Sequence, residues 1–460
     1  MIVSTARWLS IVLMPILATI PSGATEATTD AAIETSGARA WVSRFDGPAH
    51  RSDLPYQLAV SPDGSRVFVG GDSYAGGCSD LSTVAYDSSD GSQLWASRYD
   101  GAVHTCDDFA GIAIREQGDL VYVTGQAVES DAGDIVTIAY DAADGSQVWL
   151  AREERPFAGT DIGADIAIAP DGSTVYVAGT VQAATDCDPC PYHMLIAAYD
   201  AASGTRRWID EYEGAEGTAF ASALVVSTAG DVFVTGPGLR GPLESVAYDG
   251  MTGVRQWTAI AENDYVERYG LQGPKEVIDA SSDGLAVFVA GSSGSGRYSV
   301  TAYAAADGSE LWRIEKGSAT FGYRSITASR AGNTVFLAAE SKNNCLVVAL
   351  DGADGSTIWR TVYEGRGLGA SPSAIAVSAD GTDVLVTGAQ GRHKTWIYSF
   401  GTVVLDATNG DVRWSNAYGG RLGGYHLGND IAAGPDGAVY VTGESEGPTR
   451  GVDFATIKYT

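Results

Sequence analysis

The sequence predicts an all-β fold, a single eight-bladed β-propeller built from four-stranded antiparallel blades. The first observation is a repeated pattern, Ala-x-Asp-x-x-x-Gly-x-x-x-Trp, that recurs about every 50 residues with few exceptions at its Ala and Asp. Repeats of this period are typical of propellers and solenoids, in which each unit packs against its neighbours. The copies end at Trp95, Trp149, Trp208, Trp257, Trp312, Trp359 and Trp414.

The second observation is that each repeat contains the same four strands. In the third unit a short apolar strand (165–168) precedes a Pro-Asp-Gly turn, a second strand (174–179), a variable loop and a third strand (194–199). The Asp-x-x-x-Gly turn then leads into the fourth strand, which carries the Trp. Alternating apolar residues and Gly, Asp and Pro at the turns favour strands throughout. The first hairpin of each unit predicts eight blades, with Gly64, Gly118, Gly172, Gly230, Gly284, Gly332, Gly381 and Gly437 at the turns.

The third observation concerns the two ends of the repeat array. Trp41 lies in a strand with no partner strands before it, and residues 453–460 form a third strand with no fourth strand after it. We therefore expect the N-terminal strand to become the outer strand of the last blade. Closure of this kind removes an exposed sheet edge.

The first 24 residues have the features of a signal peptide. Arg7 provides a positive charge, residues 8–20 are apolar, and Pro21-Ser22-Gly23-Ala24 forms a small-residue cleavage site. We expect a flexible leader over 25–40 and the propeller over 41–460. Because no later stretch is apolar enough to span a bilayer, the mature protein is expected to be soluble and either secreted or periplasmic.

The chain is strongly acidic, with 57 Asp and Glu against 29 Lys and Arg. Nucleic acids and anionic membrane surfaces attract positive potential, so this balance argues against both as partners. It fits an exported soluble protein, and also one that gathers cations. A monomer is expected.

The five cysteines fit an oxidising compartment. Cys187 and Cys190 stand close together in one loop and predict a local disulfide. Cys78 and Cys106 fall in loops of adjacent repeats, where they could pair. Cys345 heads an apolar run and is expected to be a buried free thiol.

The repeated pattern resembles the tryptophan-docking motif of the pyrroloquinoline-quinone-dehydrogenase-like eight-bladed propellers. The last unit (429–432, 439–443 and 453–459) is also similar to short β-propeller repeats of exported bacterial proteins. The resemblance covers residues 41–460. It implies that each Trp docks between neighbouring blades, that the Gly allows a positive φ, and that the Asp bonds turn amides. It does not specify an activity.

Candidate site residues emerge when the blades are aligned on the hairpin glycines. Eleven residues before that Gly, four consecutive blades carry a polar residue, and two of these blades have a His three residues earlier, while the other four blades are small or apolar there. The aligned set is His50, Asp53, His104, Asp107, Asp161 and His426, with Asp108 and Asp430 nearby. The alignment predicts a cluster at one half of the channel mouth.

Three interpretations of this cluster remain open. Imidazoles and carboxylates together can hold a divalent metal, with His50, His104 and His426 as possible ligands and calcium as one possible ion. As a catalytic cluster they can instead form acid–base pairs. The second interpretation is a patch that binds a polar ligand. The third is that they are solvated loop residues of an acidic protein.

A second candidate is an aromatic platform on the variable loops. Trp396 is the one Trp of the mature chain outside the repeat, and it stands beside His393. Local packing would also explain its presence. Other loop aromatics that could provide contact surface are Tyr74, Phe157, Tyr265, Tyr269, Phe321 and Tyr425.

The sequence favours a non-catalytic exported scaffold that binds a protein, a glycan or another envelope or extracellular ligand through its long loops. The alternative is a metal-dependent lyase or hydrolase with a His/Asp centre, although no nucleophile motif supports a specific chemistry. A quinone-dependent dehydrogenase is less favoured. Catalytic members of the resembling family typically carry a disulfide between adjacent cysteines and long insertions, and this chain has no adjacent cysteines and little length for insertions.

Overall fold

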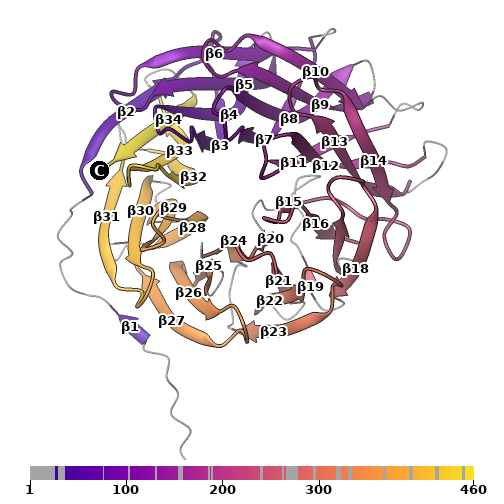
Figure 1. The fold of residues 1–460 in the computed structure, drawn as a ribbon. Coiled ribbons are helices and arrows are strands. Elements are labelled where there is room, and N and C mark those ends of the chain that lie inside the picture. The colour runs from indigo at the N-terminus through magenta and orange to yellow at the C-terminus, as the bar shows by residue number, and fades with distance from the viewer. Residues whose placement is uncertain are drawn as a thin grey trace, which may run out of the picture.

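The computed structural model describes residues 26–28, 37–75, 77–101, 104–129, 132–153, 159–184, 187, 190–238, 242–261, 264–265, 278–293, 297–316, 323–329, 334–365, 369–392, 397–419, 424–447 and 451–460. These residues form a ring of eight β-sheets (Figure 1). The predicted signal peptide lies outside them. Within these ranges no helix has the length and apolar character needed to cross a membrane.

Blades 1 to 4 are consecutive four-stranded antiparallel sheets. Blade 1 consists of β3 (Asp53–Val60), β4 (Arg66–Ala75), β5 (Cys78–Asp87) and β6 (Gln93–Tyr99). Blade 2 consists of β7 (Asp108–Ile114), β8 (Leu120–Glu129), β9 (Ala132–Asp141) and β10 (Gln147–Glu153). Blade 3 consists of β11 (Ile162–Ile168), β12 (Thr174–Gln182), β13 (Tyr192–Asp200) and β14 (Arg206–Tyr212). Blade 4 consists of β15 (Ala223–Val226), β16 (Val232–Pro237), β17 (Leu243–Tyr248) and β18 (Arg255–Ala261).

Blades 5 to 7 repeat this order, and two of them carry one extra short strand. Blade 5 consists of β20 (Ile278–Ala280), β21 (Ala286–Ser293), β22 (Arg297–Ala304) and β23 (Glu310–Lys316), with β19 (Asp264–Tyr265) also paired to β21. Blade 6 consists of β24 (Tyr323–Ala328), β25 (Thr334–Ser341), β26 (Asn344–Asp351) and β27 (Thr357–Tyr363), and β1 (Glu26–Thr28) pairs with β27 in parallel. Blade 7 consists of β28 (Ala370–Val377), β29 (Asp383–Arg392), β30 (Ile397–Asp406) and β31 (Val412–Tyr418).

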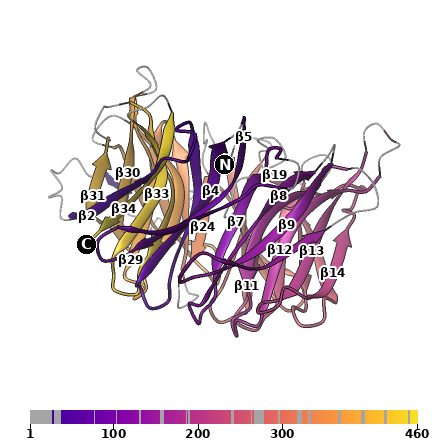
Figure 2. The same ribbon diagram turned by 90° about the horizontal axis from the view of Figure 1, so that it is seen from above.

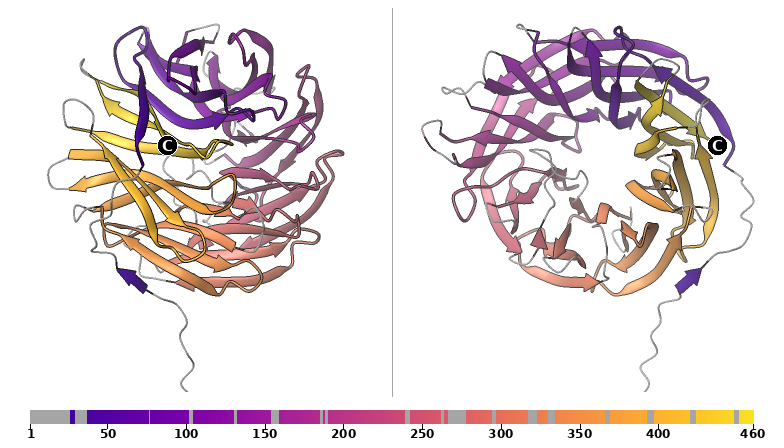
Figure 3. Two further views of the ribbon diagram at one scale, coloured as in Figure 1. Left: turned by 60° about the vertical axis from the view of Figure 1, so that its left-hand side comes forward. Right: turned by 180° about the vertical axis from the view of Figure 1, so that it is seen from behind.

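Blade 8 joins the two ends of the repeat array. It contains β32 (His426–Ala433), β33 (Val439–Glu446), β34 (Val452–Tyr459) and, as its outer strand, β2 (Arg39–Phe45). β2 runs antiparallel to β34, with Trp41 opposite Lys458 and Phe45 opposite Phe454. The indigo strand beside the yellow strands in Figure 3 shows this pairing, which has the form predicted from the sequence.

The first strand of each blade lies nearest the ring axis and the fourth lies on the outside (Figure 1). Seen from the side, the blades stand as slanted sheets around the ring (Figure 2). A cavity of about 450 Å³ opens among the first strands of blades 5 to 8. It is lined by Ile278, Asp279, Ile326, Thr327, Ala328, Ile375, Ala376, Val377, Ile431, Ala432 and Ala433.

The repeated Trp residues connect neighbouring blades. The indole Nε1 of Trp95 donates a hydrogen bond to the carbonyl of Ala142 in the next blade, at 3.1 Å. The Gly of the next turn, Gly145, has φ 73°, and a Cβ there would lie 2.6 Å from the Trp95 ring. The same Nε1–carbonyl bond, between 2.8 and 3.0 Å, is made by Trp41, Trp149, Trp208, Trp257, Trp312 and Trp359. The repeated Gly and Trp are thus required together, because the ring occupies the space of a Cβ.

A second set of contacts connects the innermost strands. The carboxylate of Asp430 accepts a hydrogen bond from the Leu58 N–H at 2.8 Å, across the seam between blades 8 and 1. Asp165 and Asp279 accept equivalent bonds from the backbone of the following blade, at 2.9 and 2.7 Å. Buried backbone N–H groups need such partners, so these aspartates serve the fold.

Candidate functional site at the long-loop ends of blades 8, 1 and 2

The aspartates aligned by the blade register are buried. Asp53, at the start of β3, is fully buried. Its carboxylate accepts hydrogen bonds from the N–H of Gly47 (2.7 Å), the hydroxyl of Ser73 (2.6 Å) and the N–H of Tyr74 (3.2 Å). Burial raises the pKa of Asp53 above its usual value, although these bonds favour the charged form. Asp53 therefore joins the loop that enters blade 1 to the second strand of that blade.

The next two blades repeat this arrangement. Asp107 accepts bonds from the N–H groups of Gly101 (2.7 Å) and Val128 (3.0 Å), and burial raises its pKa. Asp161 accepts one from the N–H of Gln182 at 3.0 Å. All three aspartates are at most 2% exposed. Their common register has a structural cause, and they are not the solvated loop residues of one alternative interpretation.

His50 and His104 occupy matching turns and are exposed. Both have positive φ values, 50° and 53°, which are uncommon for residues other than glycine. Nδ1 of His50 lies 2.8 Å from Asp46 Oδ2, and Nδ1 of His104 lies 2.9 Å from Asp100 Oδ2. The two side chains are 67% and 78% exposed. Each loop thus presents an imidazole to solvent and holds it with a carboxylate four residues earlier.

His426 differs from these two histidines because it is fully buried. Its Nδ1 lies 2.8 Å from the Ser445 hydroxyl. Ser445 lies opposite His426 in blade 8, as Ser73 lies opposite Asp53 in blade 1. Burial, with the nearby charge of Arg44, lowers the pKa of His426. In the described part of the chain, no group of three potential metal ligands within 4.8 Å of one another contains a histidine. Exposed His50 and His104 thus differ in environment from His426, and the structure does not gather the three around one point.

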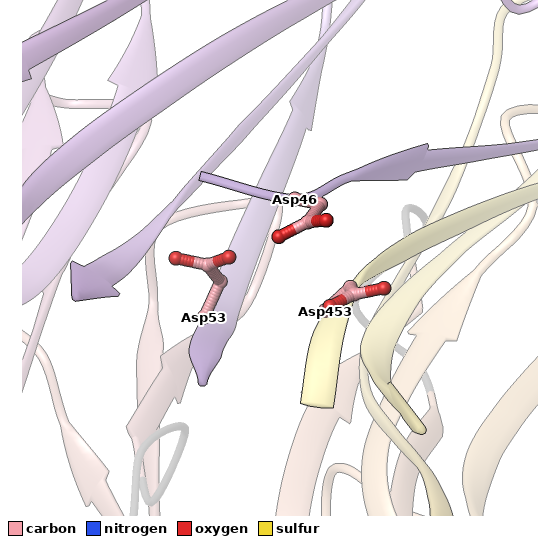
Figure 4. A group of neighbouring side chains, drawn as sticks. All are labelled: Asp46, Asp53 and Asp453. Carbon is pink, nitrogen blue, oxygen red and sulfur yellow. The ribbon is translucent and has the colours of Figure 1, made fainter. Parts of the chain in front are cut away.

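Carboxylates form two compact groups instead. The first consists of Asp46, Asp53 and Asp453, which we call the seam triad, and the second of Asp80, Asp100 and Asp107, which we call the blade-1 triad. In each group one oxygen from every residue lies within 4.8 Å of the others. Figure 4 shows the seam triad, with side chains from three different segments facing a common space.

The seam triad carries more negative than positive charge. Arg44 Nη1 lies 3.4 Å from Asp453 Oδ2. Burial and the neighbouring charge of Asp46 raise the pKa of Asp453 to about 6, against the attraction of Arg44. Among the described residues, Oδ1 of Asp46 and Oδ1 of Asp453 are buried and have no hydrogen-bond partner. Buried charged oxygens without partners are costly, so this site needs an explanation.

The blade-1 triad has the same construction one blade further along. Arg98 contacts Asp80 and lies 3.3 Å from Asp100. Asp100 Oδ1 is again buried and without a hydrogen-bond partner among the residues that the structure describes. Next to it a disulfide joins Cys78 to Cys106, 28 residues apart. This disulfide confirms a predicted pair and ties blade 1 to the loop that enters blade 2.

Four of these six aspartates were not predicted from the blade register, although a sequence signal for them exists. Asp46 and Asp100 each stand five residues after a repeated Trp and directly before a Gly. Asp80 and Asp453 both stand at the head of a third strand, directly before a buried apolar residue. The alignment used only the first hairpin, so these positions were not compared.

The predicted aromatic platform cannot be placed. Trp396 and His393 lie outside the described residues, as do Phe157, Tyr269 and Phe321. Two other loop aromatics are described. Tyr74 stacks under the guanidinium of Arg51, 5.1 Å from the ring centroid, and Tyr425 is 38% exposed.

The cysteines do not fit the quinone-binding members of the resembling family. Cys187 is bonded to Cys190, which confirms the second predicted pair, and Cys345 is a buried free thiol. No two cysteines are adjacent in the sequence, so a disulfide between adjacent residues has no counterpart here.

Cys345 is expected to resist thiol reagents in the folded protein. Burial, and then the charge of Glu340, raise its pKa to about 12, so roughly one thiol in ten thousand is ionised at pH 8. Titration with Ellman's reagent should label no cysteine in the native state and one in guanidinium. Labelling within minutes in the native state would contradict this expectation.

The sequence and the structure were compared with known proteins. A family model described as outer membrane protein assembly factor BamB matches residues 28–266 and 296–453. The comparison with curated proteins finds no match.

Several solved structures have a similar fold. Quinohemoprotein alcohol dehydrogenase from Comamonas testosteroni is 13% identical with a TM-score of 0.56, over 92% of this chain and 76% of that one. BamB from Moraxella catarrhalis is 16% identical with a TM-score of 0.51, over 92% of this chain and 100% of that one. The C-terminal WD40 domain of Sif2 is 12% identical with a TM-score of 0.56, over 89% of this chain and 97% of that one. At these identities the likeness concerns the fold alone, and it confirms the resemblance predicted from the repeat.

Proposed function

Since this chain belongs to the family described as outer membrane protein assembly factor BamB, we propose that it is an exported scaffold that binds a protein through the long-loop face of blades 8, 1 and 2. A glycan or another envelope ligand would use the same face. The observation that carries the proposal is the pair of matching loops that begin at Asp46 and Asp100 and hold exposed histidines. Loops on a rigid scaffold are where binding residues are commonly found.

The construction of the loops supports a contact surface. The His50 N–H bonds the carbonyl of Gly47 at 3.0 Å, and the His104 N–H bonds that of Gly101 at 3.1 Å, so both turns are closed. The backbone N–H groups of Gly47 and Gly101 also donate hydrogen bonds to the buried carboxylates of Asp53 and Asp107. A surface held by such hydrogen bonds loses less conformational entropy on binding.

The charge of the chain suggests the chemistry of the partner. A net charge of −28 favours a partner that presents neutral or basic groups to this face. Exposed imidazoles and Tyr425 add hydrogen bonds and aromatic area.

The disulfides support an oxidising location. Cys78–Cys106 and Cys187–Cys190 are both formed, and such bonds persist in secreted and periplasmic proteins. Together with the signal peptide predicted over 1–24, they support export. The lyase or hydrolase alternative has less support, because neither described group of three potential metal ligands contains a histidine.

Site-specific photocrosslinking tests the proposed face. A photoreactive amino acid placed at His50 or His104 should crosslink the exported protein to a discrete protein partner. The same group at Leu285, which is 70% exposed beside the first hairpin turn of blade 5, is the matched control. We expect crosslinks at the first two positions and none at the third.

Affinity for the partner then tests the histidines. Once crosslinking has identified the partner, the partner can be purified and its affinity measured. The double variant His50→Ala/His104→Ala should bind this partner at least about tenfold more weakly than the native protein, as expected when contact residues are removed. Equal crosslinking from Leu285, or unchanged affinity of the double variant, would refute the proposed face.

A further inference from the structure

We propose that the seam triad is a calcium site at the point where the ring closes. Asp46 follows the end of β2, Asp53 begins β3, and Asp453 lies in β34. β2 is the first strand of the ring, β3 is the next strand along the chain, and β34 is the last strand of the ring. An ion held by all three would bind the two ends of the ring to blade 1. The inference stands independently of the proposed protein-binding function.

The spacing of the oxygens suits this ion. Ca²⁺ binds oxygen ligands at about 2.3–2.6 Å, so two oxygens on one ion are separated by at most about 5 Å. One oxygen from each of the three residues lies within 4.8 Å of the others. Figure 4 shows the three carboxylates directed toward the same space.

Two orphaned oxygens point to a missing partner. The Asp453 side chain is 2% exposed, and its Oδ1 is buried without a hydrogen-bond partner among the described residues, while Oδ2 faces Arg44. Oδ1 of Asp46 is in the same condition. Both atoms are buried from bulk solvent, so a bound cation would satisfy them and remove the cost of leaving them unpaired.

The charge balance also favours a divalent cation. Three carboxylates and the guanidinium of Arg44 carry a net charge of −2, before any charge on exposed His50. Carboxylates held this close repel one another. One Ca²⁺ would neutralise the group.

The neighbouring blade provides an independent repetition. The blade-1 triad places Asp80, Asp100 and Asp107 in the same three structural positions. It again has one arginine, and it has one orphaned oxygen where the seam triad has two. We assign it as a second site of the same kind. Every proposed protein ligand is a carboxylate, which suits calcium rather than zinc or copper.

The experiment is calcium binding to the purified exported protein, measured by calorimetry after removal of metal with a chelator. We expect one ion per triad, with affinity in the range of extracellular modules, about 10⁻⁴–10⁻³ M. The variant Asp453→Asn should lose the seam ion and keep the other, and Asp80→Asn should do the reverse. Calcium should raise the melting temperature of the native protein, and Asp453→Asn should reduce that rise.

Asp430→Asn is the matched control, because Asp430 lies at the same seam and bonds Leu58 without belonging to either triad. It should lower the melting temperature equally with and without calcium. If Asp453→Asn does not fold, Asp46→Asn tests the same site from a loop residue that is 28% exposed.

Three results would overturn the assignment. The first is the absence of saturable calcium binding by the native protein. The second is unchanged binding by Asp453→Asn or Asp46→Asn. The third is equal affinity for Mg²⁺, which would show that the triad does not select calcium.

Discussion

A chain that starts at residue 48 is expected to fail to fold, whereas a chain that starts at residue 37 should fold into the closed ring. The shorter chain lacks β2, the outer strand of blade 8, and leaves β34 as an open edge. It also loses Trp41, whose indole bonds the Ser88 carbonyl at 2.9 Å across the seam, and the contact of Phe45 with Phe454. Size-exclusion chromatography and circular dichroism should show aggregated or unfolded material for the shorter chain only.

A synthetic peptide of residues 37–47 provides the rescue experiment. Added during refolding of the shorter chain, it should restore a cooperative thermal transition, because its strand can occupy the open edge of β34. A shorter chain that melts at the temperature of the longer one would show that β2 contributes nothing to the ring.

Replacing a repeated Trp should produce the largest loss of any single substitution. Trp257 is 8% exposed, lies between Phe233 and Tyr303, and donates a hydrogen bond to the Ala305 carbonyl at 2.8 Å. Trp257→Ala removes this contact between blades 4 and 5 and leaves a cavity, which costs about 3–5 kcal/mol in comparable cores. The midpoint of guanidinium unfolding should fall accordingly.

Two further variants separate the causes of that loss. Gln256→Ala alters the neighbouring exposed residue and should change stability by less than about 0.5 kcal/mol. Gly308→Ala keeps the indole but places a Cβ 2.6 Å from its ring, at a residue with φ 70°. It should therefore also destabilise the protein, by about 1 kcal/mol or more from the backbone conformation alone. Wild-type stability for Gly308→Ala would contradict the account of paired Gly and Trp.

Much of the fold could be predicted because each copy of the repeat requires the same residues at the same positions of a blade. The Gly four residues before each Trp has a positive φ in every copy, as at Gly91 and Gly410, and the Trp ring of the preceding blade also leaves no space for a Cβ there. The closing strand could be predicted for a related reason. The strand that carries Trp41 has no partner strands beside it in the sequence, and the last blade lacks a fourth strand. Pairing the two completes the last blade.

The candidate site could be predicted only in part. The register correctly identified Asp53, Asp107 and Asp161 as equivalent positions, but it could not show that backbone amides surround them. The burial of Asp53 depends on how closely the loop that enters blade 1 approaches it. Gly47 allows this close approach, because a Cβ at that position would collide with Asp53. The partnership of Asp46 with Asp453 joins residues at opposite ends of the chain, so no local pattern could reveal it.

Pairing of β2 with β34 also decides when the protein can finish folding. Arg39 lies opposite Tyr459, and the N–H of Thr460 bonds the carbonyl of Ala38 at 3.0 Å. The last blade therefore cannot be completed until β34, at the far end of the repeat array, is available to β2. Until then the first strand has no partner, and contacts of such large sequence separation form slowly. During that interval the unpaired strand edges are open to proteases and to other chains.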